Sequence, residues 1–151
     1  MFSVNELNAF LTLQNADFEF IKQDKPIHSA MDAEGYYPVN KSAPTFILES
    51  DDDLLACTMS INSGRLDFET LKQQFGYKKL KMAHREKVEK KTGYKVGSIP
   101  LIGHELLCIF DNNLLMYDYV YGGTGDELTT LKIVPQDIKR LNQVIHVLNS
   151  R

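Results

Sequence analysis

The sequence predicts a mixed α/β fold of the α+β kind, in which helices surround a largely antiparallel sheet that curls into a partial barrel. Two observations favour this fold: short strand-like apolar runs recur along the chain, and segments with helical spacing of apolar residues separate them. A length of 151 residues and a hydrophobic content of 43% suit a compact unit with a buried core. No change of composition divides residues 1–151, so they are expected to form a single domain.

The first predicted elements are a helix and a strand. Ser3 and Glu6 form a capping-box pattern, in which each side chain can satisfy a backbone N–H of the other residue. The helix after them carries apolar side chains on one face, at Val4, Leu7, Phe10 and Leu11. Phe18 and Phe20 then alternate with polar residues, as expected for a half-buried strand.

A hairpin and two helices are expected next. Strands at 45–48 and 54–61 flank an acidic turn that joins them. Asp67 can cap a short helix that Gly76 ends. A further helix over about 85–91 is so polar that we expect it on the surface.

The last third of the chain predicts a second hairpin, a strand and a helix. The hairpin joins strands at 106–110 and 114–121, because the Asp-Asn-Asn sequence between them tolerates tight-turn geometry. Three tyrosines would share one face of its second strand, either as a cross-strand ladder or as a base-stacking surface. A last strand at 128–134 leads into a helix with an apolar face at Ile138, Leu141, Ile145 and Leu148.

Composition restricts the function classes. A net charge of −3 argues against a protein that coats nucleic acid such as DNA without selectivity, since that binding neutralises phosphates with Lys and Arg. No long apolar run and no basic, apolar leader is present, which predicts a cytoplasmic protein that does not act at a membrane. Cys57 and Cys108 lie in apolar runs typical of reduced, packed thiols, and no clustered ligands indicate a metal or a cofactor.

Basic residues concentrate in the middle of the chain, directly before a glycine-bearing segment. Residues 65–95 hold 10 basic and 4 acidic side chains, which indicates a solvated helix face or an RNA-binding surface. The segment 97–104 then reads Gly-Ser-Ile-Pro-Leu-Ile-Gly-His. Glycine lets a backbone approach a ligand and proline holds φ fixed, so this loop can present N–H groups to a small polar ligand. A tight connection between a helix and a strand is the alternative.

Together with the sequences at 79–83 and 88–94, the segment 97–104 resembles the YbaK/EbsC-like aminoacyl-tRNA deacylase family, which includes the editing domain associated with prolyl-tRNA synthetase. The resemblance covers residues 18–141 and implies the family's α/β architecture. It also implies a free-standing enzyme that hydrolyses a mischarged tRNA, in particular tRNA-Pro carrying a small wrong amino acid, with a synthetase as a further partner. Two alternatives remain: a module that binds tRNA or an aminoacyl nucleotide without turnover, and a pure interaction domain.

The resemblance implies the residues of the site. The main chain of Gly97, Ser98 and Ile99 would supply the catalytic hydrogen-bond donors to the oxyanion of ester hydrolysis. Residues that bind the substrate are expected at Pro100, Leu101, Gly103, Lys41, Thr45, His28 and Gly123. Contacts to the tRNA are expected from Lys79, Lys81, Arg85 and Lys95.

Two features depart from the family pattern. Pro44 stands where a lysine usually precedes the Thr-hydrophobic strand, and Lys41 is the candidate to take its place if the loop bends back. The late strand also lacks the histidine of some editing domains. Of the histidines present, His104 could carry protons near neutral pH and His28 could line the pocket, although neither has a visible partner in the sequence.

Overall fold

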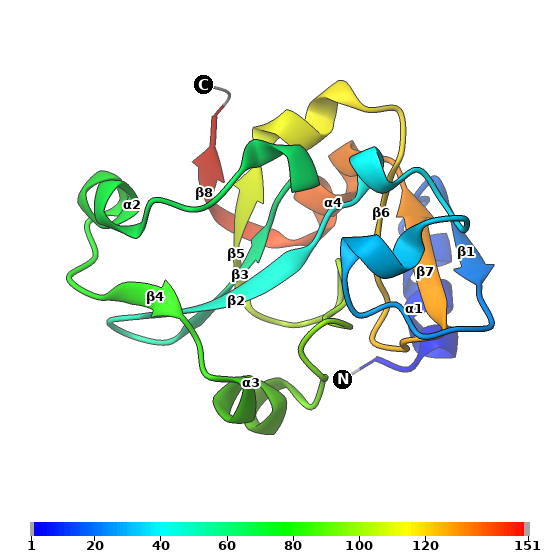
Figure 1. Cartoon of the computed structure of the whole chain (residues 1–151), viewed down its shortest axis with the longest axis horizontal. Coiled ribbons are helices and arrows are strands. Elements are labelled where there is room, and N and C mark those ends of the chain that lie inside the picture. The colour runs from blue at the N-terminus through cyan, green and yellow to red at the C-terminus, as the bar shows by residue number, and fades with distance from the viewer. Residues whose placement is uncertain (1, 150–151) are drawn as a thin grey trace.

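Eight strands run through the computed structural model, which describes residues 2–149. Residues 1, 150 and 151, at the ends of the predicted 1–151 domain, lie outside the described part. The strands are β1 (Phe18–Lys22), β2 (Thr45–Ser50), β3 (Leu54–Thr58), β4 (Leu80–Met82), β5 (Leu107–Asp111), β6 (Val120–Gly123), β7 (Thr129–Ile133) and β8 (Gln143–Leu148). They form two sheets that lie side by side, with the strand orders β4-β2-β3-β5-β8 and β1-β7-β6 (Figure 1).

Antiparallel pairing predominates in both sheets. Every pair in the three-stranded sheet is antiparallel, as are the pairs that β2 makes with β3 and β4. Among the strands of residues 2–149, only the pairs that β5 makes with β3 and β8 are parallel. The predicted mixed α/β fold with largely antiparallel strands is therefore confirmed, but the two sheets do not close into a barrel.

The described part of the chain contains four α-helices: α1 (Val4–Leu13), α2 (Phe68–Phe75), α3 (Arg85–Thr92) and α4 (Pro135–Leu141). The predicted caps are present, because Ser3 Oγ accepts the Glu6 N–H at 3.1 Å and Asp67 Oδ1 accepts the Thr70 N–H at 3.2 Å. Each bond satisfies an N–H that has no partner inside its helix. None of the helices in residues 2–149 is both long and apolar enough to span a bilayer.

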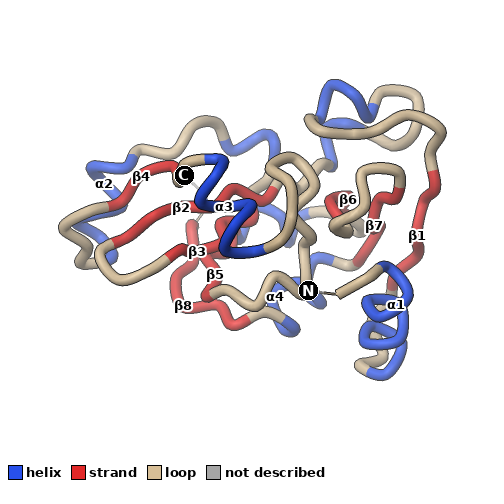
Figure 2. Tube along the Cα trace, turned by 90° about the horizontal axis from the view of Figure 1, so that it is seen from below, coloured by secondary structure: helices blue, strands red, loops and turns tan. Residues whose placement is uncertain are grey.

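The helices bury both faces of the five-stranded sheet and one side of the smaller sheet. Leu48 of β2 packs with Leu71 of α2, whereas its neighbour Ile47 packs with Val88 of α3, because successive strand side chains point to opposite faces. A third core cluster joins α1 and α4 to the three-stranded sheet. Figure 2 shows α1 beside β1 and β7, at the opposite end of the molecule from α2. This third cluster also contains Phe110 of β5, so it joins the two sheets where they meet.

The second predicted hairpin is wrong. Residues 112–116 form a 3₁₀ helix after β5, in which the Asp111 side chain accepts the Asn113 N–H at 3.0 Å and Leu114 is buried in the core. Strand β5 already has β3 and β8 at its two edges, so no edge is left for the next strand. Strand β6 joins the other sheet instead, and the tyrosines before it do not form a ladder along one strand.

The last predicted helix is too long. Helix α4 ends at Leu141, where the Asn142 side chain donates to the Ile138 carbonyl at 3.0 Å. Residues 143–148 form strand β8, parallel to β5. Half of the residues of β8 are β-branched, which favours an extended chain, although the apolar positions also fit a helical spacing.

Candidate functional site

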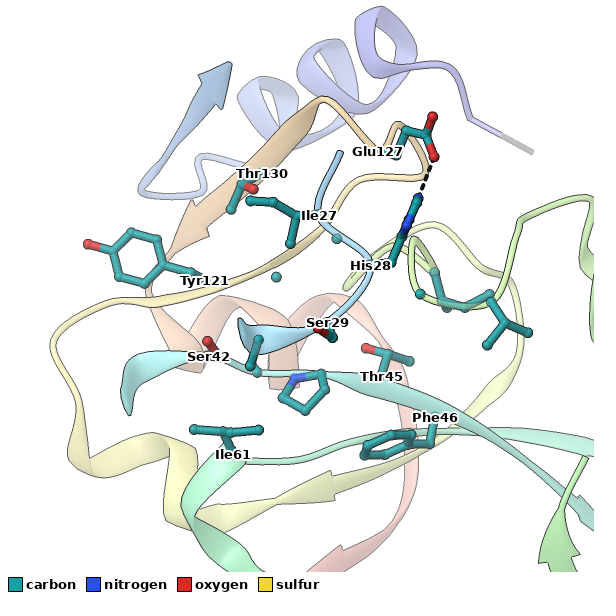
Figure 3. Close-up of a pocket in the computed structure, with 18 of the residues that line it drawn as sticks. Ile27, His28, Ser29, Ser42, Thr45, Phe46, Ile61, Tyr121, Glu127 and Thr130 are labelled. Carbon is teal, nitrogen blue, oxygen red and sulfur yellow. Dashed lines mark hydrogen bonds and ion pairs between the residues drawn. The ribbon is translucent and has the colours of Figure 1, made fainter. Parts of the chain in front are cut away.

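A cavity of about 320 Å³ lies where β2 of the larger sheet approaches β6 and β7 of the smaller one. Its wall is mostly apolar and includes Ile27, Phe46 and Ile47. Polar side chains from different elements also face it, among them Thr45 and Thr130 (Figure 3). Ligand sites have this mixture of an apolar wall and a few placed polar groups, and their volumes begin at about 300 Å³.

Gly97 lines this cavity and lies against the loop that carries His28. Its φ is +96°, and a Cβ added there would lie 2.8 Å from the His28 carbonyl oxygen, so both the conformation and the contact favour glycine. Ile99 also lines the cavity, whereas the Ser98 N–H donates to the Lys95 carbonyl at 3.0 Å. The N–H groups of Gly97 and Ile99 donate no hydrogen bond within residues 2–149, so the protein leaves both unengaged.

The second half of the glycine-bearing segment packs into the interior. Pro100 forms a β-bridge with Gly123, and the Leu101 N–H donates to the Gly123 carbonyl at 3.0 Å. Leu101 is fully buried, and Gly103 lies against the ring of Phe2. Gly123 lines the cavity as expected, but Pro100, Leu101 and Gly103 do not, so any effect of these three on a ligand is indirect.

His104 is buried behind this segment and does not line the cavity. Its Nδ1 accepts the Leu106 N–H at 3.1 Å, and its Nε2 has no partner among the described residues. Burial lowers the pKa of His104 to about 4, because desolvation disfavours the charged ring. The expected role of a proton carrier near neutral pH therefore does not fit His104.

His28 lines the cavity and has a partner that sequence reasoning missed. Its Nε2 lies 2.6 Å from Oε2 of Glu127, which also lines the cavity, and a dashed line marks the pair in Figure 3. His28 lies in the segment between β1 and β2, and Glu127 lies in the turn between β6 and β7. Local sequence carries no signal of this pair, because 99 positions separate its members.

Pro44 and Thr45 line the cavity at the start of β2. Thr45 Oγ1 lies 3.1 Å from Thr58 Oγ1, which ties this end of the strand to β3. Lys41 does not line the cavity, and its Nζ lies 3.0 Å from Asp118 Oδ1. The structure therefore does not place Lys41 where the usual family lysine is expected.

Ser42 and Tyr37 are two further cavity residues that the sequence did not single out. Ser42 is 3% exposed, and its side chain interacts with the Tyr37 hydroxyl. Tyr37 stacks on Tyr121 with ring centroids 4.7 Å apart. Burial raises the pKa of the Tyr37 hydroxyl, and the nearby Ser42 opposes this shift.

Basic side chains surround Glu49 of β2, which pairs with the edge strand β4. Three lysines approach its carboxylate: Lys79 at 2.6 Å, Lys81 at 3.7 Å, and Lys87. Hydrogen bonds from Lys79 and Lys87 lower the pKa of Glu49 to about 2. The other two predicted tRNA contacts, Arg85 and Lys95, are exposed and form no ion pair within residues 2–149.

A second cavity, of about 540 Å³, lies between α2, the loop after β3 and the end of β8. Its buried carboxylate, Asp111, accepts the Ser60 N–H at 2.9 Å, the Ser63 hydroxyl and the Asn113 N–H at 3.0 Å. These bonds hold together the loops that follow β3 and β5. None of the predicted site residues lines this cavity, so the cavity between the sheets is the better candidate.

Residues 25–141 match the family model of the aminoacyl-tRNA editing domain. The chain belongs to the aminoacyl-tRNA editing domain family. The matched range contains the Gly97 loop, the His28–Glu127 pair and the basic segment, and of the residues that line the cavity only Gln23 lies outside it. The narrower YbaK/EbsC-like group stays a prediction.

Solved structures share the fold of this editing domain. The hypothetical protein APE2540 has 20% sequence identity and a TM-score of 0.81, over 93% of this chain and 96% of that one. A protein described as a candidate trans-editing enzyme for prolyl tRNA synthetase has 20% identity and a TM-score of 0.78, over 97% and 98% of the two chains. Likeness at these identities establishes the architecture of the two sheets and their helices.

Proposed function

We propose that this editing domain hydrolyses the ester bond of a mischarged aminoacyl-tRNA, acting in trans in the cytoplasm. The proposed substrate is tRNA-Pro carrying a small wrong amino acid, and a synthetase is a further candidate partner. The observation that carries the proposal is the largely apolar cavity between the sheets of a chain in this family. Its volume of about 320 Å³ lies near the lower end of the range for ligand sites, which favours a small aminoacyl group with part of the terminal adenosine.

Hydrolysis of such an ester needs an oriented carbonyl, a water molecule and donors for the developing oxyanion. The N–H groups of Gly97 and Ile99 are the donors that we propose, since no other described group engages them. The Ser98 N–H is already bonded to Lys95 and is not part of this pair. The apolar wall strengthens such contacts, because charge is less screened there than in water.

The basic segment supports binding of tRNA phosphates beside the cavity. Lys79 and Lys81 share the Glu49 carboxylate with a third lysine, so this group keeps a net positive charge. Arg85 and Lys95 are exposed and unpaired within the described residues. We therefore propose that all four predicted basic residues contact the tRNA backbone.

A second candidate function is a binding module that holds an aminoacylated tRNA end without turnover. Pro44 favours this alternative, because a proline lines the cavity where the family pattern has a lysine. The ion pair between Lys41 and Asp118 favours it as well, since Lys41 would have to leave that pair to reach the cavity. The two candidates share a ligand and differ in turnover alone.

Release of amino acid from preformed misacylated tRNAs tests the proposal. We expect purified protein to release the amino acid from alanyl- or cysteinyl-tRNA-Pro faster than buffer does. The double variant Arg85→Glu/Lys95→Glu should bind tRNA more weakly and lose part of its salt dependence, whereas Lys22→Glu, an exposed lysine on β1, is the matched control. Binding without release from any tRNA would favour the binding module, and neither binding nor release would contradict both functions.

A further inference from the structure

We propose that His28 and Glu127 form a proton-transfer pair at the cavity, in which His28 is the general base for the hydrolytic water and Glu127 is its positioning residue. This inference rests on the proposed hydrolysis. It assigns the chemical step to side chains that neither the family model nor the glycine-bearing segment identifies.

Hydrogen bonds to the backbone of His28 and Glu127 hold the two loops in place without engaging either side chain. The Glu127 carbonyl accepts the Ile27 N–H at 3.0 Å and Gln23 Nε2 at 2.9 Å. The His28 N–H donates to an Asp32 carboxylate oxygen at 3.1 Å. Gly97 closes the other side, because its Cα lies against the His28 backbone with no room for a Cβ. Such support is what a preorganised catalytic pair requires.

The contact between the two side chains selects a tautomer of the imidazole. A carboxylate accepts hydrogen bonds, so Glu127 Oε2 at 2.6 Å favours the form of His28 that carries its proton on Nε2. The lone pair then lies on Nδ1, and Nδ1 makes no hydrogen bond with any described residue. A base oriented by a third group in this way is a recurring arrangement for activating a nucleophile.

The step balances without any further reactant. Water loses a proton to His28 Nδ1 while its oxygen forms a bond to the ester carbonyl carbon, and the N–H groups of Gly97 and Ile99 stabilise the resulting oxyanion. The tetrahedral intermediate then breaks its bond to the ribose oxygen. The proton passes from Nδ1 to that oxygen, so the products are the free amino acid and the terminal ribose hydroxyl. Glu127 keeps its negative charge throughout.

His28 is the best placed of the four histidines for this role. Its side chain is 53% exposed and that of Glu127 is 36% exposed, so water reaches both. His104 is buried and its lowered pKa keeps it neutral, while His146 has its Nε2 2.9 Å from the Tyr77 hydroxyl. The exposed His84 does not line the cavity.

Two further carboxylates lie near the pair. Asp32 accepts the His28 N–H, and Asp126 precedes Glu127 on the turn before β7 and lines the cavity. Asp126 is already committed to its own turn, where its carboxylate accepts the Leu128 N–H at 3.0 Å and the Thr129 hydroxyl at 3.1 Å. Glu127 is the carboxylate in contact with the imidazole, so its removal should change the behaviour of the ring most.

The test compares single-turnover deacylation of alanyl-tRNA-Pro by the wild type, His28→Ala, Glu127→Gln and the control His84→Ala. We expect His28→Ala to lower the rate about 100-fold, the lower range of general base catalysis, with unchanged tRNA affinity and partial rescue by imidazole in the buffer. Glu127→Gln should also lower the rate, because an amide that donates to Nε2 moves the ring proton to Nδ1 and removes the base. His84→Ala should keep the wild-type rate.

Rescue by imidazole separates a catalytic role from a structural one. Imidazole in the buffer should restore part of the rate of His28→Ala, because it replaces the missing base, and should leave the rates of the wild type and His84→Ala unchanged. A wild-type rate in His28→Ala without imidazole would overturn the pair while leaving the proposed hydrolysis intact. A wild type that releases no amino acid from any misacylated tRNA would overturn both.

Discussion

Replacing Gly97 with alanine tests whether the contact between the Gly97 loop and the His28 loop shapes the cavity. The added Cβ would lie 2.8 Å from the His28 carbonyl oxygen and 3.3 Å from its Cα and Cβ atoms. These are mainly backbone atoms that cannot rotate away, so one of the two loops must shift. The shift would displace both the Gly97 N–H and the His28 side chain from their places in the cavity wall.

Gly35→Ala is a matched control for the backbone strain. Gly35 has φ +91°, close to the +96° of Gly97, but no atom lies within 4 Å of a Cβ added there. An unfavourable backbone conformation costs about 1–3 kcal/mol in either variant. Overpacking adds about 1–3 kcal/mol, and only in Gly97→Ala. The difference between the two variants in free energy of unfolding should therefore be about 1–3 kcal/mol.

Urea unfolding and deacylation of alanyl-tRNA-Pro are the assays for these two variants. We expect Gly97→Ala to be the less stable variant and to lose most of its turnover, while Gly35→Ala keeps turnover at the same temperature. Equal losses of stability, together with equal turnover, would refute the reasoning, because they would show that the two loops do not depend on close contact.

Three other substitutions give separate readouts. The lowered pKa of Glu49, about 2, gives the wild type stability that is complete above pH 4.5 and is lost as the pH falls toward 2. In urea unfolding, Glu49→Gln should therefore lose less stability than the wild type over this pH range. Parallel curves of stability against pH would contradict this. The wild type should lose stability as the pH falls from 6.5 to about 4, because the His104 ring takes up a proton in the unfolded chain but not in its buried position. His104→Asn should not show this loss. An unchanged pH dependence of stability in the variant would contradict the burial argument. Pro44→Lys should raise deacylation by placing an amine in the cavity wall without removing a backbone N–H, and an unchanged rate would show that the missing lysine does not limit turnover.

Local signals in the sequence were enough to predict the first two helices and the first hairpin. Ser3 and Asp67 cap their helices through bonds to residues three positions away, so a short window contains the whole interaction. The hairpin of β2 and β3 likewise depends on one acidic turn between two short apolar runs. Windows of this size cannot predict which sheet β6 joins, because that depends on β8 occupying the second edge of β5.

Some residues of the candidate site could likewise be predicted from local sequence, and others could not. Gly97 and Ile99 could be selected from their own segment, since a glycine-bearing loop beside a basic stretch is a local pattern. Leu101 and Gly103 could not be distinguished from them, because only the packed structure reveals which side of the loop faces the core. The His28–Glu127 pair joins two loops that lie 99 positions apart in the sequence, so no local pattern could predict it.

The most direct test of the account is to map the binding of a non-hydrolysable alanyl-adenosine amide by NMR on the wild-type protein. We predict saturable chemical-shift changes at the amides of Gly97, Ile99, Thr45, Gly123 and Thr130, which line the cavity between the sheets. No binding, or changes confined to α2 and the cavity beside it, would contradict the claim that this cavity holds the aminoacylated end of a tRNA.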